Sequence, residues 1–390
     1  MKTISLLMMI VVYSLHLNAQ NADNNTAENM VQNNTSGVSI GGYAQIDYNQ
    51  PFVKDKRSNG TLDVHRMVML FGYNFNKNTS FVTEIEYEHV SELYVEQAFL
   101  NHKFTNWLNF RAGLLLIPMG ILNEYHEPVT YNGVERPVID NNISPTTWRE
   151  LGAGFAGRFD GLGMKYQLYV VNGFSSYATS GTLSGKTGLR GGRQKGAESF
   201  ISAPNLSFKL DYYNIPGLNL GVAGYMGDTQ SKLYNGIDKN DNAAMAKADS
   251  SVVGVNMLGV NASYSKFGFA IKGQYYLLNL KNTDQYNTFT KKDLGKQLTG
   301  YYVDLSYAYP LGDSKEKELV PFIRYESLDT HAQTEGGLVR NDAYNLHYIT
   351  TGLGLKLAKG AMLKIDYQWF KSKFDTDYTK QLNAGVAIWF

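Results

Sequence analysis

The sequence predicts an all-β protein: a transmembrane antiparallel β-barrel of about sixteen strands that runs from residue 38 to residue 390. Three observations support this prediction. Apolar and polar residues alternate with a period of two, the alternating segments are about ten residues long or more, and the connections between them alternate between short and long.

The alternation is clearest at the C-terminal end of the chain. In "YTKQLNAGVAIWF", Leu382, Val386 and Ile388 occupy even positions, whereas Gln381 and Asn383 occupy odd positions. A period of two residues is typical of a strand with one apolar and one polar face. The segments "AMLKIDYQWF", "YYVDLSYAY", "FGFAIKGQYYL" and "LGMKYQLYVV" repeat the pattern. Antiparallel sheets of soluble proteins also alternate in this way, so a soluble all-β solenoid or sandwich stays open as an alternative.

Segment lengths and connections favour a membrane barrel. A tilted strand needs about 9–11 residues to cross a bilayer, and aromatic residues crowd the ends of the apolar faces as they do in interface girdles. The short connections are 76–79, 105–107, 160–161, 215–217, 266–268 and 359–360, and the longer ones are 50–62, 115–149, 173–198, 229–252, 281–298 and 331–346. Short periplasmic turns and long outer loops are typical of outer-membrane barrels. Because lipid does not tolerate an open sheet edge, the sheet must close, and about sixteen strands leave a lumen wide enough for water.

The first residues predict export. Lys2 supplies a basic start, residues 4–15 form an apolar run, and Ala19 provides the small residue of a cleavage site, so residues 1–19 are predicted to be a signal peptide. Residues 20–37 are polar and rich in asparagine, and we expect a disordered periplasmic lead-in. Residues 38–390 are then the barrel domain. The expected location is the outer membrane of a Gram-negative type of cell, reached through the periplasm.

Composition excludes several classes of protein. Loss of the signal peptide removes Lys2 and no acid, which leaves 35 basic against 35 acidic residues, so nothing indicates a nucleic-acid partner. The chain has no cysteine, which excludes disulfides, zinc–thiolate sites and thiol catalysis. No run beyond the signal peptide is apolar enough to form a transmembrane helix.

The parity of each strand predicts which charged side chains face the lumen. The inward bases are Arg66, Arg111, Arg158, Lys165, Lys209, Lys272, Arg324, Lys356 and Lys364, and the inward acids are Asp47, Glu84, Glu86, Glu88, Glu150, Asp211, Asp304, Glu326 and Asp366. The bases are spread around the barrel, whereas the acids gather in "FVTEIEYEHV" and continue into Glu92 and Glu96. Walls of opposite charge would create a transverse field across a pore. The simpler interpretation is that a wet lumen needs polar side chains.

One segment departs from the strand pattern. Residues 120–150, "GILNEYHEPVTYNGVERPVIDNNISPTTWRE", carry acids, bases, prolines and Trp148 with no sustained period. A loop of that length is usually functional or disordered. It lies within Arg111–Gly157, which closely resembles the segment that marks the phosphate-selective porin O and P family of outer-membrane porins. The runs "NEYHEP", "NGVERP" and "PTTWRELGAG" carry this resemblance.

The resemblance implies a sixteen-stranded, often trimeric channel whose third outer loop folds into the lumen and narrows it. When the outer connection that is not long is counted as well, residues 115–149 form the third outer loop. The constriction is then expected from Arg111, Glu124, His126, Glu127, Glu135, Arg136, Arg149 and Glu150. Because buried charges need partners, Glu135, Arg136, Arg149 and Glu150 are expected to pair with each other and with wall residues.

The function implied by the resemblance is passive diffusion of small hydrophilic or ionic solutes, including anions such as phosphate, with no enzymatic activity, cofactor or metal ligand. Phosphate-selective members of the family resemble one another in clustered lysines at the constriction, whereas this chain has no lysine between Lys103 and Lys165. Selectivity for phosphate is therefore not indicated. The alternative is an outer-membrane barrel enzyme, or a surface receptor or adhesin that acts through residues 173–198 and 229–252.

Two further segments suggest partners. Asp238, Asn240, Asn242 and Asp249 have the spacing of a calcium loop, but Ala243 stands where the sharp turn needs glycine, so a solvated polar loop is the simpler interpretation. The terminal "AIWF" is predicted to be an assembly signal, read at Phe390 by the outer-membrane insertion machinery. Outer-membrane lipid and two further copies of the chain in a homotrimer are the other expected partners.

Overall fold

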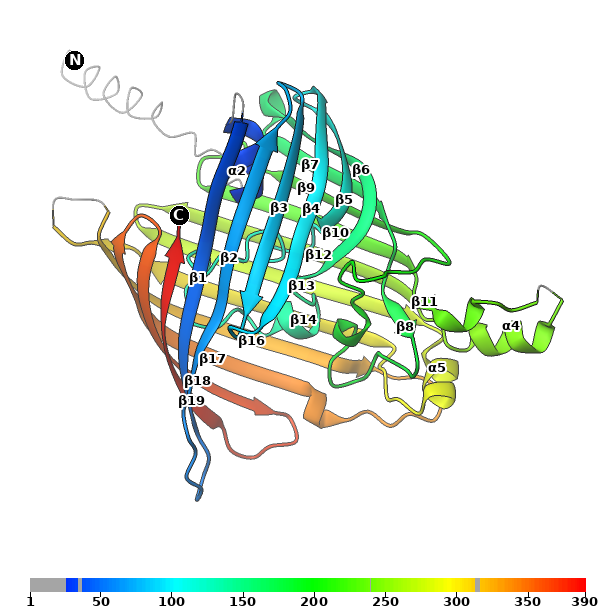
Figure 1. The fold of residues 1–390 in the computed structure, drawn as a ribbon. Helices are drawn as coiled ribbons and strands as arrows, with labels where there is room; N and C mark the ends of the chain where they lie inside the picture. Colours follow the sequence, from blue (N-terminus) through cyan, green and yellow to red (C-terminus); the bar gives the residue numbers. More distant parts are fainter. Residues whose placement is uncertain (1–25, 34–36, 239, 313–315) are drawn as a thin grey trace, which may run out of the picture.

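The computed structural model describes residues 26–33, 37–238, 240–312 and 316–390, and these form a closed antiparallel β-barrel of sixteen wall strands (Figure 1). The predicted signal peptide lies outside the described residues. The wall strands are β1 (Gly37–Phe52), β2 (Thr61–Asn74), β3 (Thr79–Glu88), β4 (Glu92–Thr105), β5 (Leu108–Leu116), β6 (Arg149–Phe159), β7 (Met164–Val171), β9 (Asn205–Tyr212), β10 (Leu218–Asp228), β12 (Gly254–Lys266), β13 (Phe269–Lys281), β14 (Gln297–Tyr307), β16 (Glu318–Gln333), β17 (Asn345–Ala358), β18 (Ala361–Ser372) and β19 (Thr379–Trp389).

The chain also contains shorter strands and helices outside the set of wall strands. A two-residue strand, β15 (Tyr309–Pro310), pairs with β16, and β8 (Ser175–Tyr177) pairs with β11 (Gln230–Ser231) in a small parallel sheet outside the wall. The helices are α2 (Thr26–Asn33), α3 (Ile139–Asn142), α4 (Asn242–Asp249), α5 (Thr283–Thr290) and the 3-10 turns η1 (Asp160–Leu162), η2 (Arg190–Gly192), η3 (Lys232–Tyr234) and η4 (Asp342–Tyr344). No helix among the described residues is long and apolar enough to cross a membrane.

The first and last strands close the wall. β1 pairs with β19 in antiparallel register, with Tyr43 opposite Trp389. Beyond that pair, Gly42 and Phe390 exchange two backbone hydrogen bonds of 2.9 Å each. Every wall strand therefore has two neighbours, so the barrel has no free sheet edge.

The predicted alternation is confirmed, with the apolar face outward. On β14, Tyr301, Val303 and Leu305 are exposed, whereas Tyr302 and Asp304 between them are buried in the interior. β18 follows the same rule, with Leu363 and Ile365 exposed and Lys364 and Asp366 buried. An apolar outer face around a polar, charged interior is the arrangement of a membrane barrel and the reverse of a soluble one.

The long and short connections lie at opposite ends of the barrel, as predicted. α4 and α5 belong to the long connections and lie at the end opposite the C-terminus (Figure 1). The connection between β3 and β4 is an exception on the long side, since it contains only residues 89–91. The calcium-loop spacing falls on α4, where Asp241 caps the helix by accepting a hydrogen bond from the backbone N–H of Ala244.

The expectation of disorder throughout residues 20–37 is wrong for residues 26–33, which form α2. This helix lies beside β2 and β3 inside the wall, with Ala27 and Met30 buried. Thr26, at its start, donates a hydrogen bond to Glu127 (2.8 Å) and accepts one from the indole N–H of Trp389 (2.9 Å). The polar composition that predicted disorder is compatible with a short helix because the barrel supplies both the apolar and the polar contacts.

Candidate functional site

The third outer loop, residues 117–148, turns into the lumen between β5 and β6. Its two ends are joined by a backbone hydrogen bond from Ile117 to the carbonyl of Trp148 (3.0 Å). The side chain of Asn123 closes the base further, because it bonds the carbonyls of both residues (2.7 and 2.8 Å) and accepts from the N–H of Trp148 (2.8 Å). Trp148 is fully buried against Phe174 and Tyr225.

Glycine permits the loop to approach the wall closely at Gly120. Its φ is +68°, and a Cβ at this position would lie 1.8 Å from the hydroxyl oxygen of Tyr276 on β13. Any other residue would be strained in this conformation and would collide with the wall. The next residue, Ile121, donates its N–H to the side chain of Gln274, also on β13 (2.9 Å).

The far wall holds the middle of the loop through charged side chains. The ammonium group of Lys364 on β18 donates to three loop carbonyls, those of Pro128 (2.5 Å), Tyr131 (2.6 Å) and Gly133 (2.9 Å). The carboxylate of Asp366 accepts from the N–H of Val134 (2.6 Å). Charged groups that meet backbone in a buried site make stronger hydrogen bonds than neutral ones.

A second charged pair on the wall holds the following segment. Arg324 on β16 donates to Glu326 on the same strand (2.9 Å) and to the carbonyl of Glu135 (3.2 Å). The other oxygen of Glu326 accepts from the N–H of Val138 (2.6 Å). Both wall side chains are fully buried. In this segment the loop is therefore bonded to the wall through its backbone.

The fourth outer connection, residues 172–204, covers the third loop. Arg190 donates to the carbonyl of Thr146 (2.6 Å), and Arg193 donates to the carbonyls of Pro145 (3.2 Å) and Thr146 (3.1 Å). Burial and the neighbouring Arg190 lower the pKa of Arg193 to about 9. The third loop is thus fixed from the outside as well as from the wall.

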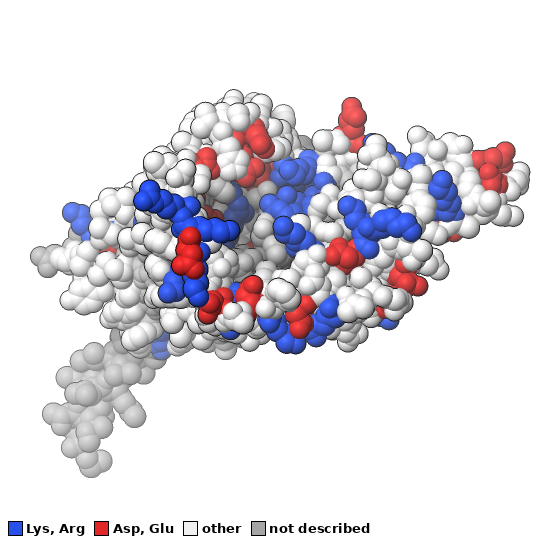
Figure 2. All heavy atoms as spheres, turned by 90° about the horizontal axis from the view of Figure 1, so that it is seen from below, with Lys and Arg blue, Asp and Glu red and all other residues white. Residues whose placement is uncertain are grey.

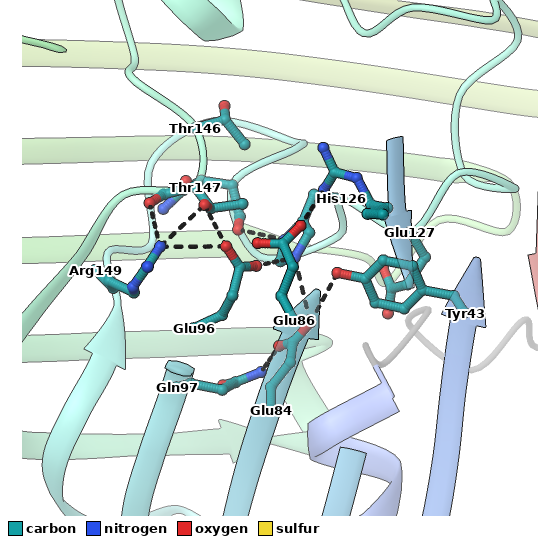
Figure 3. Close-up of polar contacts among 12 residues, drawn as sticks. Tyr43, Glu84, Glu86, Glu96, Gln97, His126, Glu127, Thr146, Thr147 and Arg149 are labelled. Carbon is teal, nitrogen blue, oxygen red and sulfur yellow. Dashed lines mark hydrogen bonds and ion pairs between the residues drawn. The ribbon is translucent and has the colours of Figure 1, made fainter. Parts of the chain in front are cut away.

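A cluster of buried charges joins the other side of the loop to β3 and β4 (Figure 3). The Nε2 atom of His126 lies 2.9 Å from Glu96 and 3.4 Å from Glu84. Glu96 also accepts hydrogen bonds from Thr147 and Arg149 (the latter 3.2 Å). Although burial by itself lowers the pKa of the His126 imidazole, its close contacts with Glu84 and Glu96 and their negative charges raise the pKa well above its usual value.

A cavity of about 390 Å³ separates part of the loop from the wall. Residues 121–130 contribute to one side, and Lys165, Lys209 and Lys272 contribute to the other. Lys209 donates to Glu124 (3.3 Å) and to the carbonyl of Gly120 (2.9 Å), so it also anchors the loop. Figure 2 shows basic side chains gathered around a hollow in the face that it views, with acidic side chains among them.

The structure brings most of the predicted constriction residues to the loop or to the wall beside it. Glu124, His126, Glu127, Arg149 and Glu150 are buried inside the barrel. The predicted wall residues that contact the loop directly are Glu84, Lys165, Lys209, Lys272, Asp304, Arg324, Glu326, Lys364 and Asp366. The remainder lie on the wall: Arg111 bonds Asn101 and Tyr169, Glu86 lies 3.6 Å from Arg66, Glu88 lies opposite Glu92, Arg158 lies near Asp160, and Lys356 pairs with Glu318.

The expectation that Glu135, Arg136, Arg149 and Glu150 pair with each other is wrong, whereas contacts with wall residues are present for Glu135, Arg149 and Glu150. Glu135 accepts from Asn49 (3.0 Å), Arg149 pairs with Glu96, and Glu150 accepts from the indole of Trp148 (2.8 Å). Within the described chain, Nη1 of Arg136 is buried without a hydrogen-bond partner. Neutral groups and wall residues satisfy the charges of Glu135, Arg149 and Glu150 instead.

Asp140, which sequence reasoning missed, links α3 to β13. Its carboxyl group accepts from Gln274 (2.5 Å) and Tyr276 (3.0 Å). Burial raises its pKa to about 7. In "VIDNN", Asp140 carries no sequence signal of this role, since it resembles any polar loop residue.

The raised pKa of Asp140 predicts that the loop is held less tightly as pH rises. An acid whose pKa is raised on folding favours the folded state below its usual value of 3.8, and this contribution is lost as pH passes through about 7. We therefore expect single-channel current to become larger or noisier between pH 5 and pH 8. Asp140→Asn should flatten this dependence, because its amide oxygen accepts the same bonds at every pH. An equal pH response in the variant would contradict the assignment.

Comparison with solved structures defines the class of this fold. OmpF of Salmonella typhi, solved in complex with daunomycin, superposes with a TM-score of 0.59 and 14% identity over 92% of this chain and 99% of that chain. An anion-selective porin from Comamonas acidovorans superposes with a TM-score of 0.58 and 13% identity over 91% of this chain and 100% of that chain. The chain therefore has the fold of an outer-membrane porin.

A closer relative gives the family. An uncharacterized protein of Aquifex aeolicus is 30% identical over 353 residues, which are 87% of this chain and 78% of that protein. The chain belongs to the same family as this Aquifex protein. No family model matches the chain, so the narrower placement among phosphate-selective O and P porins stays a proposal.

Proposed function

We propose that the protein is an outer-membrane porin through which small hydrophilic or ionic solutes diffuse passively, without catalysis. The observation that carries this proposal is the third outer loop, which lies inside a closed barrel and is bonded to several wall strands beside a cavity that lysines line. A loop that only covered the surface would have no reason to bury backbone and charge in the lumen. The porin fold of the solved relatives supports the same conclusion.

We further propose that anions are preferred over cations. Three lysines, Lys165, Lys209 and Lys272, line the cavity against two acids, Glu127 and Asp211. Charged walls of one sign raise the local concentration of the opposite ion. Placement in the O and P family, assembly as a homotrimer and delivery through the periplasm belong to this proposal, and they are supported by the resemblance of the third loop.

The proposal is tested by recording single channels in a planar bilayer under a salt gradient. The protein should form discrete open steps, and the reversal potential should have the sign of an anion-preferring pore. Absence of any ion conductance from correctly folded protein would overturn the porin assignment. A reversal potential of the opposite sign would leave the porin assignment standing and would contradict the proposed preference for anions.

Charge reversal at the cavity should move the selectivity. In Lys165→Glu and Lys272→Glu the reversal potential should shift toward cations, because each change replaces a lining base with an acid. Lys54→Glu provides the matched control, since Lys54 is largely exposed and pairs with Asp377 among the outer connections (3.5 Å). An equal shift in all three variants would indicate a general surface-charge effect and would contradict the role of the cavity.

A further inference from the structure

We propose that Glu84, Glu96 and His126 form a binding site for a divalent transition-metal ion, with zinc the ion that fits best. The site joins β3 and β4 to the third outer loop (Figure 3). It departs from the expectation that the chain has no metal ligand, and it goes beyond diffusion of solutes.

The separations of the three ligand atoms suit one ion. All three lie within 4.8 Å of one another, and Nε2 of His126 lies 2.9 Å from Oε2 of Glu96 and 3.4 Å from Oε1 of Glu84. Ligand atoms that each lie about 2.0–2.2 Å from a shared zinc ion are separated by roughly 3.0–3.5 Å in tetrahedral or octahedral geometry. Two of the three separations are therefore close to those that coordination requires, and the third lies within 4.8 Å.

The direction of the ring nitrogen provides a second, independent observation. Neither Nε2 of His126 nor Oε2 of Glu96 makes a hydrogen bond within the described residues, although both side chains are at least nine-tenths buried and only 2.9 Å apart. The oxygen thus lies off the axis along which Nε2 would donate. A metal ion bound to Nε2 would lie on that axis, and the carboxylate oxygens that also bind the ion would lie off the axis. A plain histidine–carboxylate ion pair has no reason to leave this geometry in a buried site.

The other polar atoms of the cluster orient the ligands. Nδ1 of His126 lies 3.1 Å from the carbonyl of Asn123, which can only accept, so Nδ1 carries the proton and Nε2 is the atom left for a metal. Tyr43 (2.8 Å) and Gln97 (2.6 Å) donate to Glu84. Each ligand therefore has a partner that holds it, as in established metal sites.

A supporting pair orients the second carboxylate in the same way. Thr147 and Arg149 both donate to Oε1 of Glu96, so its Oε2 is the oxygen that faces the ring. Glu86 lies next to the ligands, but its Oε1 lies 3.6 Å from the guanidinium group of Arg66. Within the described chain, Oε2 of Glu96 is therefore the buried carboxylate oxygen that a bound cation would satisfy.

The donor set indicates the class of ion. Calcium and magnesium prefer oxygen ligands only, whereas one imidazole with two carboxylates suits zinc and its neighbours in the first transition row. The bound ion would link the third loop, through His126, to the wall strands β3 and β4.

The first test measures metal in untagged protein extracted from membranes, by mass spectrometry of the elements. Native protein should carry one zinc ion per chain, and His126→Gln and Glu96→Gln should each lose it. His89→Gln is the matched control, because His89, His65 and Asp63 form a second, more exposed cluster that could also hold a metal. Metal that persists in His126→Gln and disappears in His89→Gln would overturn the proposal.

The second test reloads protein that has been unfolded, stripped with a chelator and refolded in detergent. Zinc should bind and raise the melting temperature, and cobalt in its place should give the visible absorption of a nitrogen- and oxygen-ligated ion. Thr147→Val, which keeps all three ligands, should weaken zinc binding by about 10–100-fold. Refolded wild-type protein that neither binds zinc nor changes its melting temperature would refute the site. Neither test depends on conductance, so failure here leaves the proposed porin function standing.

Discussion

Deletion of residues 117–147, bridged by a short Gly–Ser linker, should raise single-channel conductance severalfold and leave the barrel folded. The loop occupies the lumen, where Lys364, Arg324 and Lys209 bond its carbonyls from the wall. The wall makes its own backbone hydrogen bonds from strand to strand, so it does not need the loop to close. Folding is checked by the difference in gel migration between boiled and unboiled samples.

A matched deletion separates this effect from a general loosening of the outer face. Removal of residues 238–249, which include the helix α4 of another long connection, should leave conductance unchanged, because α4 lies beyond the wall (Figure 1). Equal conductance of the third-loop deletion and the wild type would mean that the loop does not limit flow. The porin assignment would then lose the observation on which it rests.

The strands were predictable because each residue's environment alternates along the wall. Tyr301, Val303 and Leu305 repeat at the same spacing wherever the outer face must be apolar, and this spacing is readable without knowledge of any neighbour. Closure, strand number and the position of the third outer loop follow from the same local pattern together with the alternation of connection lengths. The structure confirms all of these.

The contacts of the third loop were not predictable in the same way. Lys364 was expected to face the lumen. Its hydrogen bonds to three carbonyls of the third loop, however, depend on how a segment far away in the sequence folds back. The meeting of His126 with Glu84 and Glu96 depends on the same path. α2 was missed because its polar composition is compatible with disorder until the barrel provides Trp389 and Glu127 as partners.

Phe390→Ala should leave most of the chain unassembled in the periplasm, although the same variant refolds and is stable in detergent. The backbone of Phe390 makes both of its hydrogen bonds to Gly42, and these survive loss of the ring. The ring is about two-thirds exposed (68%), so the folded barrel depends on it little. The change therefore removes a group that the finished wall barely uses and that an assembly factor can recognise. Surface protein is measured by protease accessibility on whole cells.

Two interpretations of Phe390 separate in this experiment. If the ring only anchors the chain in the interface, its loss costs at most the burial of one aromatic side chain, about 1.5–3 kcal/mol, and surface levels stay normal. If the insertion machinery recognises the ring, the last strand of the variant is no longer delivered to β1. The amount of variant at the cell surface then falls sharply, while its stability in detergent is retained. Phe374→Ala is the control, since Phe374 is an exposed aromatic residue in the β18–β19 connection, away from the terminus, and should have no effect. Normal surface levels of Phe390→Ala would reject the assembly signal, because the closing hydrogen bonds alone would then suffice to complete the barrel.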